Sequence, residues 1–231
     1  MTITQGWARA DSIDQVLERM DGIDAALPRA DGVAVFNRMY RQVTQLIETA
    51  AEANEFQAGD FLIRLDVHFA NLFFEAYAAD ATGTKIPRAW APLFEHRAKP
   101  NTHPIQFALA GMNAHISHDL PHAVVSTCKE NGTVPDDDTP QHSDFTETNR
   151  VLEEASEEIK SWFHTGVVAS LDDMGGKVDD GLSMWGIHVA RAGAWMVSQT
   201  LWGLSDNPTM LELFNNGHRR GVEFASRGIL L

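Results

Sequence analysis

The chain has 231 residues, of which 44% are hydrophobic and 22% charged, and this composition excludes a chain that is disordered throughout. Its 32 acidic and 18 basic residues give a formal charge of −14 with no basic face, so we expect neither nucleic acid nor a membrane as a partner. Because no secretory signal and no apolar run of roughly 18 residues is visible, we expect a cytoplasmic protein. The single cysteine excludes an intramolecular disulfide.

Apolar residues that recur at helical spacing predict the first two helices. The first covers residues 13–20, with Asp11 or Ser12 as its N-cap and Gly22 as its end. A long second helix follows Pro28 and places its apolar residues on one face.

The third predicted helix spans residues 61–79 and takes Asp60 as its N-cap. It is apolar on most sides, which predicts a central position in the fold. Pro87 begins a short fourth helix that carries Trp90, because proline favours the first turn of a helix.

A fifth helix is predicted from Pro104 to about residue 129, and residues 130–142, rich in Gly, Pro and Asp, form a loop. After that loop, Asp144 and Glu147 resemble a capping box at the start of a sixth helix.

The C-terminal part continues the helical pattern. Gly175 and Gly176 break the chain, a helix carries the apolar residues of 185–196, and a last helix covers about 209–226. No segment alternates as a strand does. The sequence therefore predicts an all-α protein, a single domain over residues 1–231 with about eight helices, in which 130–142 is an internal loop.

The fifth helix carries the residues that best support chemistry. His115, His118, Asp119 and His122 are spaced i, i+3, i+4 and i+7, which places them along one face of an α-helix. Imidazole and carboxylate groups one turn apart can share a divalent metal ion such as zinc, manganese or iron. The other interpretation is a polar helix face on which Asp119 orients one imidazole and solvent satisfies the rest.

Pro121 adds a backbone feature beside this cluster. Because proline has no N–H, the carbonyl of Ser117 loses its helical partner, and the helix should kink or end there.

A metal ion held by His115 and Asp119 needs a further ligand from elsewhere, and Asp66 and His68 interrupt an otherwise apolar helix. Asp66 is the favoured ligand, and a salt bridge with Arg64 or another arginine is the alternative. Asn113 is a further candidate for hydrogen bonding in the catalytic site.

A second group of residues is typical of a substrate pocket, although an aromatic stripe at helical spacing is more often core. In this interpretation the tryptophans form an apolar wall and an arginine reaches a carboxylate or phosphate. These candidates are Trp90, Arg97, Trp185, His188, Arg191 and Trp195.

Several segments resemble a bacterial family, domain of unknown function 5995. They are LPRADGVAVFNRMYRQV, LDVHFANLFFEAY, AWAPLFEHR and, most specifically, QFALAGMNAHISHDLPHAVV, within residues 27–202. This resemblance implies relatives without implying a reaction.

A local resemblance bears on the chemistry. His115-x-x-x-Asp119, followed by Leu120, Pro121 and His122, is similar to the His-x-x-x-Asp segments of the zinc-dependent phospholipase C and single-strand nuclease group. About ten residues match, and the order of the other ligands of that group is not reproduced. The resemblance implies that His115 and Asp119 bind metal, and it does not imply phosphodiesterase activity.

Three hypotheses fit these residues. The first is an enzyme that acts on a small-molecule substrate by hydrolysis, elimination or cyclisation, with one divalent metal on His115 and Asp119 and with His118 as ligand or general base. The second is a metal-free enzyme that uses His118 and Asp119 as acid and base. The third is a non-catalytic, helical protein that binds a small molecule.

Overall fold

The computed structural model describes residues 9–53, 55–166 and 184–231, and for 154–166 and 184–185 it describes the backbone alone. Within these ranges every regular element is helical, which confirms the predicted all-α fold. The elements number eight if the contiguous α5, η2 and α6 are counted as one helix. They are α1 (Ile13–Ala26), α2 (Gly32–Glu52), α3 (Gly59–Ala81), α4 (Ala91–His96), α5 (Pro104–Ala114), η2 (His115–Asp119), α6 (Leu120–Asn131), α7 (Pro140–Gly166), α9 (Met184–Gly203) and α10 (Pro208–Ile229).

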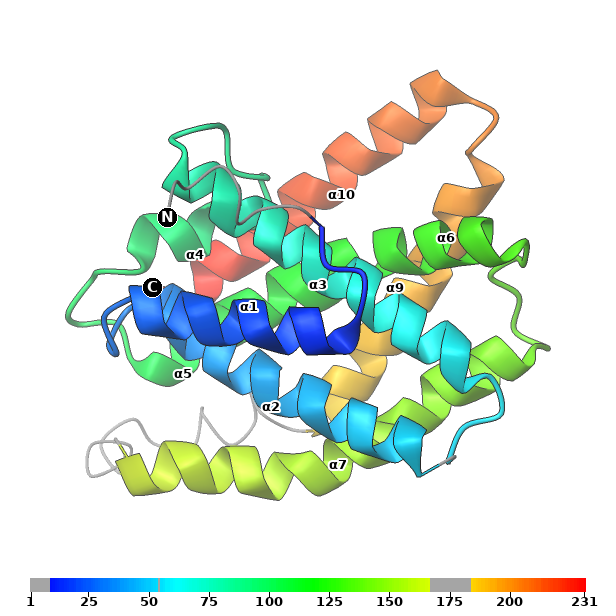
Figure 1. The fold of residues 1–231 in the computed structure, drawn as a ribbon. Helices are drawn as coiled ribbons and strands as arrows, with labels where there is room; N and C mark the ends of the chain where they lie inside the picture. The colour runs from blue at the N-terminus through cyan, green and yellow to red at the C-terminus, as the bar shows by residue number, and fades with distance from the viewer. Residues whose placement is uncertain (1–8, 54, 167–183) are drawn as a thin grey trace.

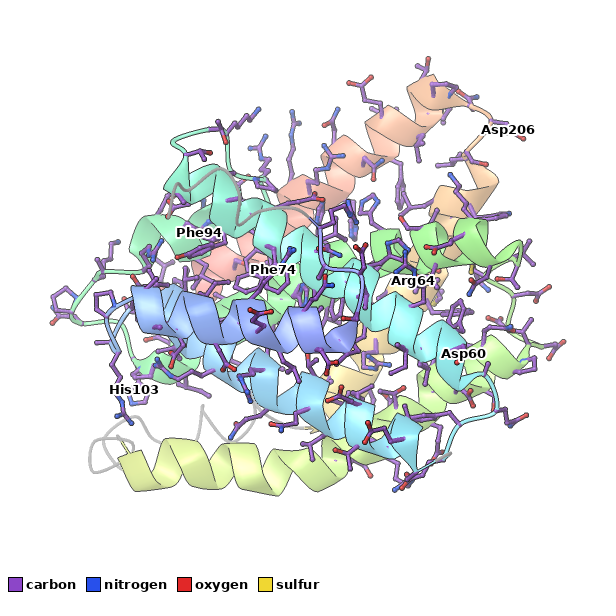
Figure 2. All side chains as sticks on the ribbon, viewed as in Figure 1. Asp60, Arg64, Phe74, Phe94, His103 and Asp206 are labelled. Atoms are coloured by element: carbon purple, nitrogen blue, oxygen red, sulfur yellow. The ribbon has the colours of Figure 1, made fainter. Side chains whose placement is uncertain are left out.

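Helix α3 lies at the centre, as its apolar sequence predicts. It contacts α1, α2, α6 and α7, and Figure 1 shows it running diagonally across the molecule beside α1. Its aromatic side chains, including Phe74, join the same buried cluster as Phe94 of α4, and both are labelled in Figure 2. No helix in the described ranges is both long enough and apolar enough to cross a lipid bilayer.

Helix α1 begins where the sequence predicts but ends later than predicted. Ser12 is the N-cap, and its hydroxyl accepts from the backbone N–H of Gln15. Gly22 does not end the helix, which continues to Ala26, because an isolated glycine inside a helix costs only about 1 kcal/mol and packing supplies more than that.

The predicted roles of Asp60 and Asp144 are wrong. Helix α3 begins at Gly59 with no side-chain cap, and the carboxylate of Asp144 instead accepts from the backbone N–H groups of Gln57 and Ala58, just before α3. Helix α7 begins at Pro140, so Asp144 lies within it and the loop between α6 and α7 is shorter than predicted. The predicted break at Gly175–Gly176 lies outside the described residues.

Two glycines let α2 and α5 approach closely. A Cβ atom at Gly32 would overlap the ring of Phe107, and a Cβ atom at Gly111 would overlap the ring of Phe36. Phe36 is almost fully buried and packs against His115, so this contact positions the helix that carries the polar cluster.

We expect Gly111→Ala to destabilise the protein by about 1–3 kcal/mol, because the added methyl group must displace the Phe36 ring from a packed core. Chemical denaturation measures the change. Gly22→Ala is the matched control, since nothing lies within 4 Å of a Cβ there and alanine favours a helix by up to about 1 kcal/mol. Equal effects of the two substitutions would contradict the close contact.

Candidate functional site

The polar cluster lies where the long helix changes its hydrogen-bonding pattern. Between α5 and α6, residues His115–Asp119 form a π-helical turn, in which the N–H of Leu120 bonds to the carbonyl of His115. Pro121 follows directly, and the carbonyl of Ser117, which lacks its helical partner as predicted, accepts a hydrogen bond from His218 Nε2 at 2.7 Å. The predicted kink therefore takes the form of a π turn, a feature frequent at functional sites.

The carboxylate of Asp119 is the centre of the cluster. Its Oδ2 accepts from Trp90 Nε1 at 2.9 Å and from His115 Nδ1 at 3.0 Å, and its Oδ1 accepts from His118 Nδ1 at 2.7 Å. Burial raises the pKa of Asp119, but the hydrogen bonds and charges of the two histidines outweigh it, and the pKa is lowered. Both imidazoles carry hydrogen on Nδ1 in this arrangement, which leaves both Nε2 atoms unused by Asp119.

His115 is the enclosed member of the pair. Its ring stacks on Phe69 with the centroids 3.4 Å apart, and Phe36, Tyr40 and Trp90 surround it. Burial lowers the pKa of His115 by more than Asp119 raises it, so the imidazole is neutral at pH 7. Its Nε2 is buried and has no hydrogen-bond partner among the described residues.

His118 is the member that reaches the surface. Its side chain is 11% exposed, against 3% for His115. With Nδ1 on Asp119, its Nε2 is the ring nitrogen left without a partner among the described residues, and an imidazole oriented by a carboxylate in this way can accept a proton.

His122 lies beside His118, with the ring centroids 5.1 Å apart. The pKa of His122 is lowered to about 4, mainly by burial. The charges of His118, Arg219 and His218 lower it further, whereas the charge of Asp119 raises it. His122 is therefore neutral at pH 7, and the positive charges around it favour that neutral form.

The predicted metal ligands do not come together. Within the described residues, no three His, Cys, Asp or Glu side chains are arranged to hold a metal ion. His68 Nε2 lies 2.6 Å from Glu130 Oε2, and Arg64 binds the other oxygen of Glu130 at 2.7 Å. His68 thus faces a surface ion pair, and Arg64 is not the partner of Asp66. Both oxygens of Asp119 already accept N–H donors, which leaves little lone-pair capacity for a cation.

Asp66 points into the protein from α3 and makes no ion pair among the described residues. Its Oδ2 is buried without a hydrogen-bond partner. Burial raises its pKa to about 7, Arg191 acts in the opposite direction and Glu48 in the same direction. The arginine that Asp66 faces is therefore Arg191, and its attraction does not offset the cost of burial.

Tyr40 links Asp66 to the cluster. Its ring centroid is 4.4 Å from that of His115, and burial, followed by the charge of Asp66, raises its pKa well above the usual value. Thr44 lies close enough to lower that pKa, although neither hydroxyl oxygen has hydrogen-bond geometry to a partner among the described residues. Sequence reasoning missed Tyr40, Thr44 and His218, because in sequence they belong to ordinary amphipathic helices.

Other predicted site residues have structural partners. Asn113 donates to the Val222 carbonyl and to Ser226 Oγ, and so ties α5 to α10 instead of facing a substrate. Trp90 is fully buried and belongs to the cluster through its bond to Asp119. Arg97 pairs with Asp31 and lies apart from the histidines.

The predicted pocket residues that lie on α9 contact α7 and the loop before it. Arg191 donates to Asn149 and to the Phe145 carbonyl, and Trp195 Nε1 donates to Asp137 at 3.0 Å. His188 pairs with Glu153 at 3.3 Å. The side chain of Trp185 lies outside the described residues.

We expect acid to destabilise the protein through His122. Because its pKa is about 4 in the folded state, below the ordinary 6.5, protonation favours the unfolded chain, and stability is lost as pH falls from about 6.5 to 4. Denaturant melts across this range should show a loss of up to about 3 kcal/mol that is smaller in His122→Gln. His96→Gln, a change outside the cluster, should retain the slope of the parent; a parental slope in His122→Gln contradicts the assignment.

We expect Asp66 to act in the opposite direction. Its folded-state pKa of about 7 exceeds the ordinary 3.8, so its protonated form favours folding, and stability is lost as pH rises from about 4 through 7. At pH 8, Asp66→Asn should therefore be more stable than the parent, by up to about 4 kcal/mol in denaturant melts. Asp60→Asn, on an exposed position of the same helix, should retain the parental pH dependence. An Asp66→Asn variant that is less stable at pH 8 would mean that Arg191 needs the carboxylate charge.

A comparison with protein-family models matches residues 13–231 to DUF5995, described as a family of unknown function. Neither the curated proteins nor the solved structures contain a significant match to this chain. The match covers nearly the whole sequence, including the π turn and its polar cluster, and the chain therefore belongs to the DUF5995 family.

Proposed function

We propose that this protein is an enzyme that acts on a small molecule without a metal ion and uses His118, oriented by Asp119, to move a proton. The observation that carries the proposal is the bond of 2.7 Å between His118 Nδ1 and Asp119 Oδ1, which commits one ring nitrogen and leaves Nε2 as the other nitrogen of a side chain that is 11% exposed.

The chemistry follows from the fixed tautomer. With hydrogen on Nδ1, the Nε2 lone pair of His118 can accept a proton from water or from a substrate, and the resulting imidazolium is stabilised by Asp119. Nε2 can then return that proton to a leaving group. This sequence serves hydrolysis, elimination or cyclisation, and none of these needs a covalent intermediate on the imidazole.

His115 and Trp90 are positioning residues in this proposal. Each donates a hydrogen bond to Asp119 Oδ2, so the carboxylate remains ionised and fixed although it is buried. Oδ1 is thereby directed to His118. A polar helix face exposed to solvent would need no such donors, because water could hydrogen-bond the carboxylate. The donors from Trp90 and His115 therefore support a role of Asp119 in orienting His118.

The first test compares the parent and His118→Gln on a panel of esters, lactones, phosphodiesters and β-elimination substrates. For any substrate that the parent converts, we expect a 10²–10⁴-fold lower kcat for His118→Gln, the usual contribution of a general base. Activity should persist in the presence of a chelator. Activity that chelator abolishes and zinc or manganese restores would favour the metal-dependent enzyme, and equal activity of the two proteins would refute the role of His118.

A second measurement does not need the substrate. We expect ¹⁵N NMR at pH 7 to show His115 and His118 with hydrogen on Nδ1, the less common tautomer, and Asp119→Asn to release His118 from that state. Diethyl pyrocarbonate should acylate His118 at Nε2 before the enclosed His115. Hydrogen on Nε2 of His118 in the parent, or acylation of His115 first, would contradict the proposed arrangement.

A further inference from the structure

A hollow of about 710 Å³ lies at the start of α2 and α5, away from the histidine cluster. Its walls are the segment 28–31 before α2 and the segment 97–104 before α5. Pro104 and His115 are eleven positions apart, or about 16 Å along the helix, so this hollow and the cluster are separate places on one helix. The volume falls within the roughly 300–1,000 Å³ of small-molecule sites.

The charge of this hollow is opposite to that of the chain. Four of its lining residues are cationic, Arg29, Arg38, Arg97 and Lys99, and one is acidic, Asp31. Acidic residues outnumber basic ones by 32 to 18 in the whole chain. Arg38 and Arg97 are ion-paired with aspartates, so the positive charge that remains for a ligand comes from Arg29 and Lys99, and it favours an anionic ligand.

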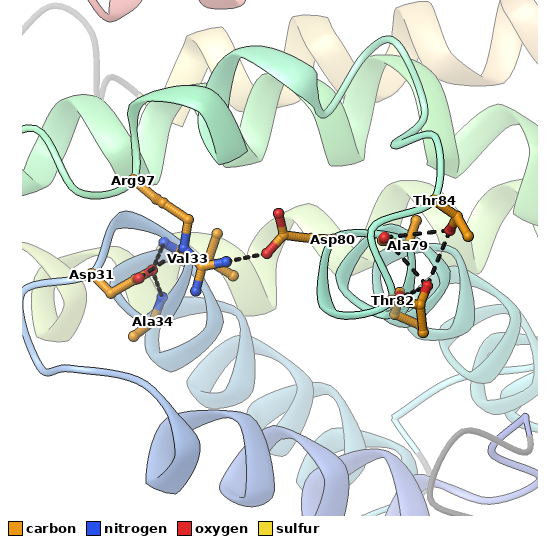
Figure 3. Close-up of polar contacts among 9 residues, drawn as sticks. Asp31, Val33, Ala34, Ala79, Asp80, Thr82, Thr84 and Arg97 are labelled. Carbon is orange, nitrogen blue, oxygen red and sulfur yellow. Dashed lines mark hydrogen bonds and ion pairs between the residues drawn. The ribbon is translucent and has the colours of Figure 1, made fainter. Parts of the chain in front are cut away.

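Two of the cations hold the walls in place. Arg97 Nε binds Asp31 Oδ2 at 2.7 Å and its NH1 binds Asp80 at 2.5 Å, while Asp31 Oδ1 caps α2 through the N–H groups of Val33 and Ala34 (Figure 3). Arg38 likewise binds Asp24 at 2.7 Å and the carbonyl of Arg29 at 2.6 Å. These contacts fix both segments with respect to α2.

The other two cations are available. Arg29 and Lys99 are exposed, one on each of the two wall segments, and neither side chain has an acidic partner in the part of the chain that the structure describes. Between them the lining is largely apolar, with Val35, Phe107 and several prolines. The backbone of Gly32 packs closely against the ring of Phe107, which is itself nearly fully buried.

We propose that this hollow binds a small organic anion, with its apolar body on Phe107 and Val35 and its carboxylate or phosphate between Arg29 and Lys99. The apolar floor favours a ligand with a hydrophobic body, and the two exposed cations, Arg29 and Lys99, favour one negatively charged end. The site is independent of His118.

Calorimetry and NMR shift mapping with naphthalene-2-carboxylate, octanoate and phenyl phosphate test the site. Each anion is compared with a neutral analogue of the same body, naphthalene-2-carboxamide, octanamide or phenol, and with inorganic phosphate. We expect at least one anion to bind and to shift the amides of 28–35 and 97–107, with affinity at least about fivefold above that of its neutral analogue and of phosphate. Raising the salt concentration should weaken it.

Variants separate the charge from the cavity. The double variant Arg29→Gln, Lys99→Gln should weaken the anion at least about fivefold and leave the neutral analogue unchanged. Lys129→Gln with Arg220→Gln removes two exposed charges elsewhere and should bind as the parent does. Ala98→Trp, on the lining, should block both compounds.

The proposal is overturned if no anion binds, if neutral and charged compounds bind equally, if phosphate alone binds as well, or if the control pair matches the test pair. His118→Gln should not alter binding, so this result does not depend on the proposed catalysis.

Discussion

The burial of one carboxylate constrains the centre of this protein. An ionised Asp119 inside a helical core costs several kcal/mol unless charge-assisted hydrogen bonds compensate it. Compensation comes from three N–H groups on two segments, the residue that precedes α4 and the π turn itself. Because each donor must aim at one of two oxygens, the indole of Trp90 and both imidazoles are restricted together, and the tautomers of His115 and His118 follow from the position of Asp119.

The π turn makes this arrangement possible. In a regular α-helix, residues 115, 118 and 119 share a face, but the neighbours 118 and 119 are about 100° apart around the axis. The wider turn lets His118 and Asp119 bond directly. Pro121 removes an N–H that the regular pattern needs, and His218 of α10 satisfies the carbonyl that is left over. The last helix thus supports the geometry of the cluster without belonging to it.

Next to the hydrogen-bonded carboxylate of Asp119 lie several buried polar atoms that have no hydrogen-bond partner among the described residues. The hydroxyl groups of Tyr40 and Thr44, Oδ2 of Asp66 and Nε2 of His115 are buried without hydrogen-bond partners among the described residues. Most buried polar groups in proteins are paired, so these atoms on α2, α3 and η2 distinguish the region from the bonded carboxylate of Asp119. The opposite pH responses expected of Asp66 and His122 come from the same cause, because burial favours the neutral form of each.

Local chemistry let the sequence predict the helices and the composition of the cluster. Ser12 caps α1, Pro121 frees the carbonyl of Ser117, and His115 shares a turn with Asp119, because each of these relations spans four residues or fewer. The same reasoning failed for Asp144, whose partners are 86 and 87 residues away, and it did not foresee that His68 contacts Glu130, which is 62 residues away. Spacing along one helix fixes which side chains are neighbours on it. Which face of another helix packs against them depends on the whole core, and here the close approach of α2 to α5 through Gly32 and Gly111 places Phe36 against His115.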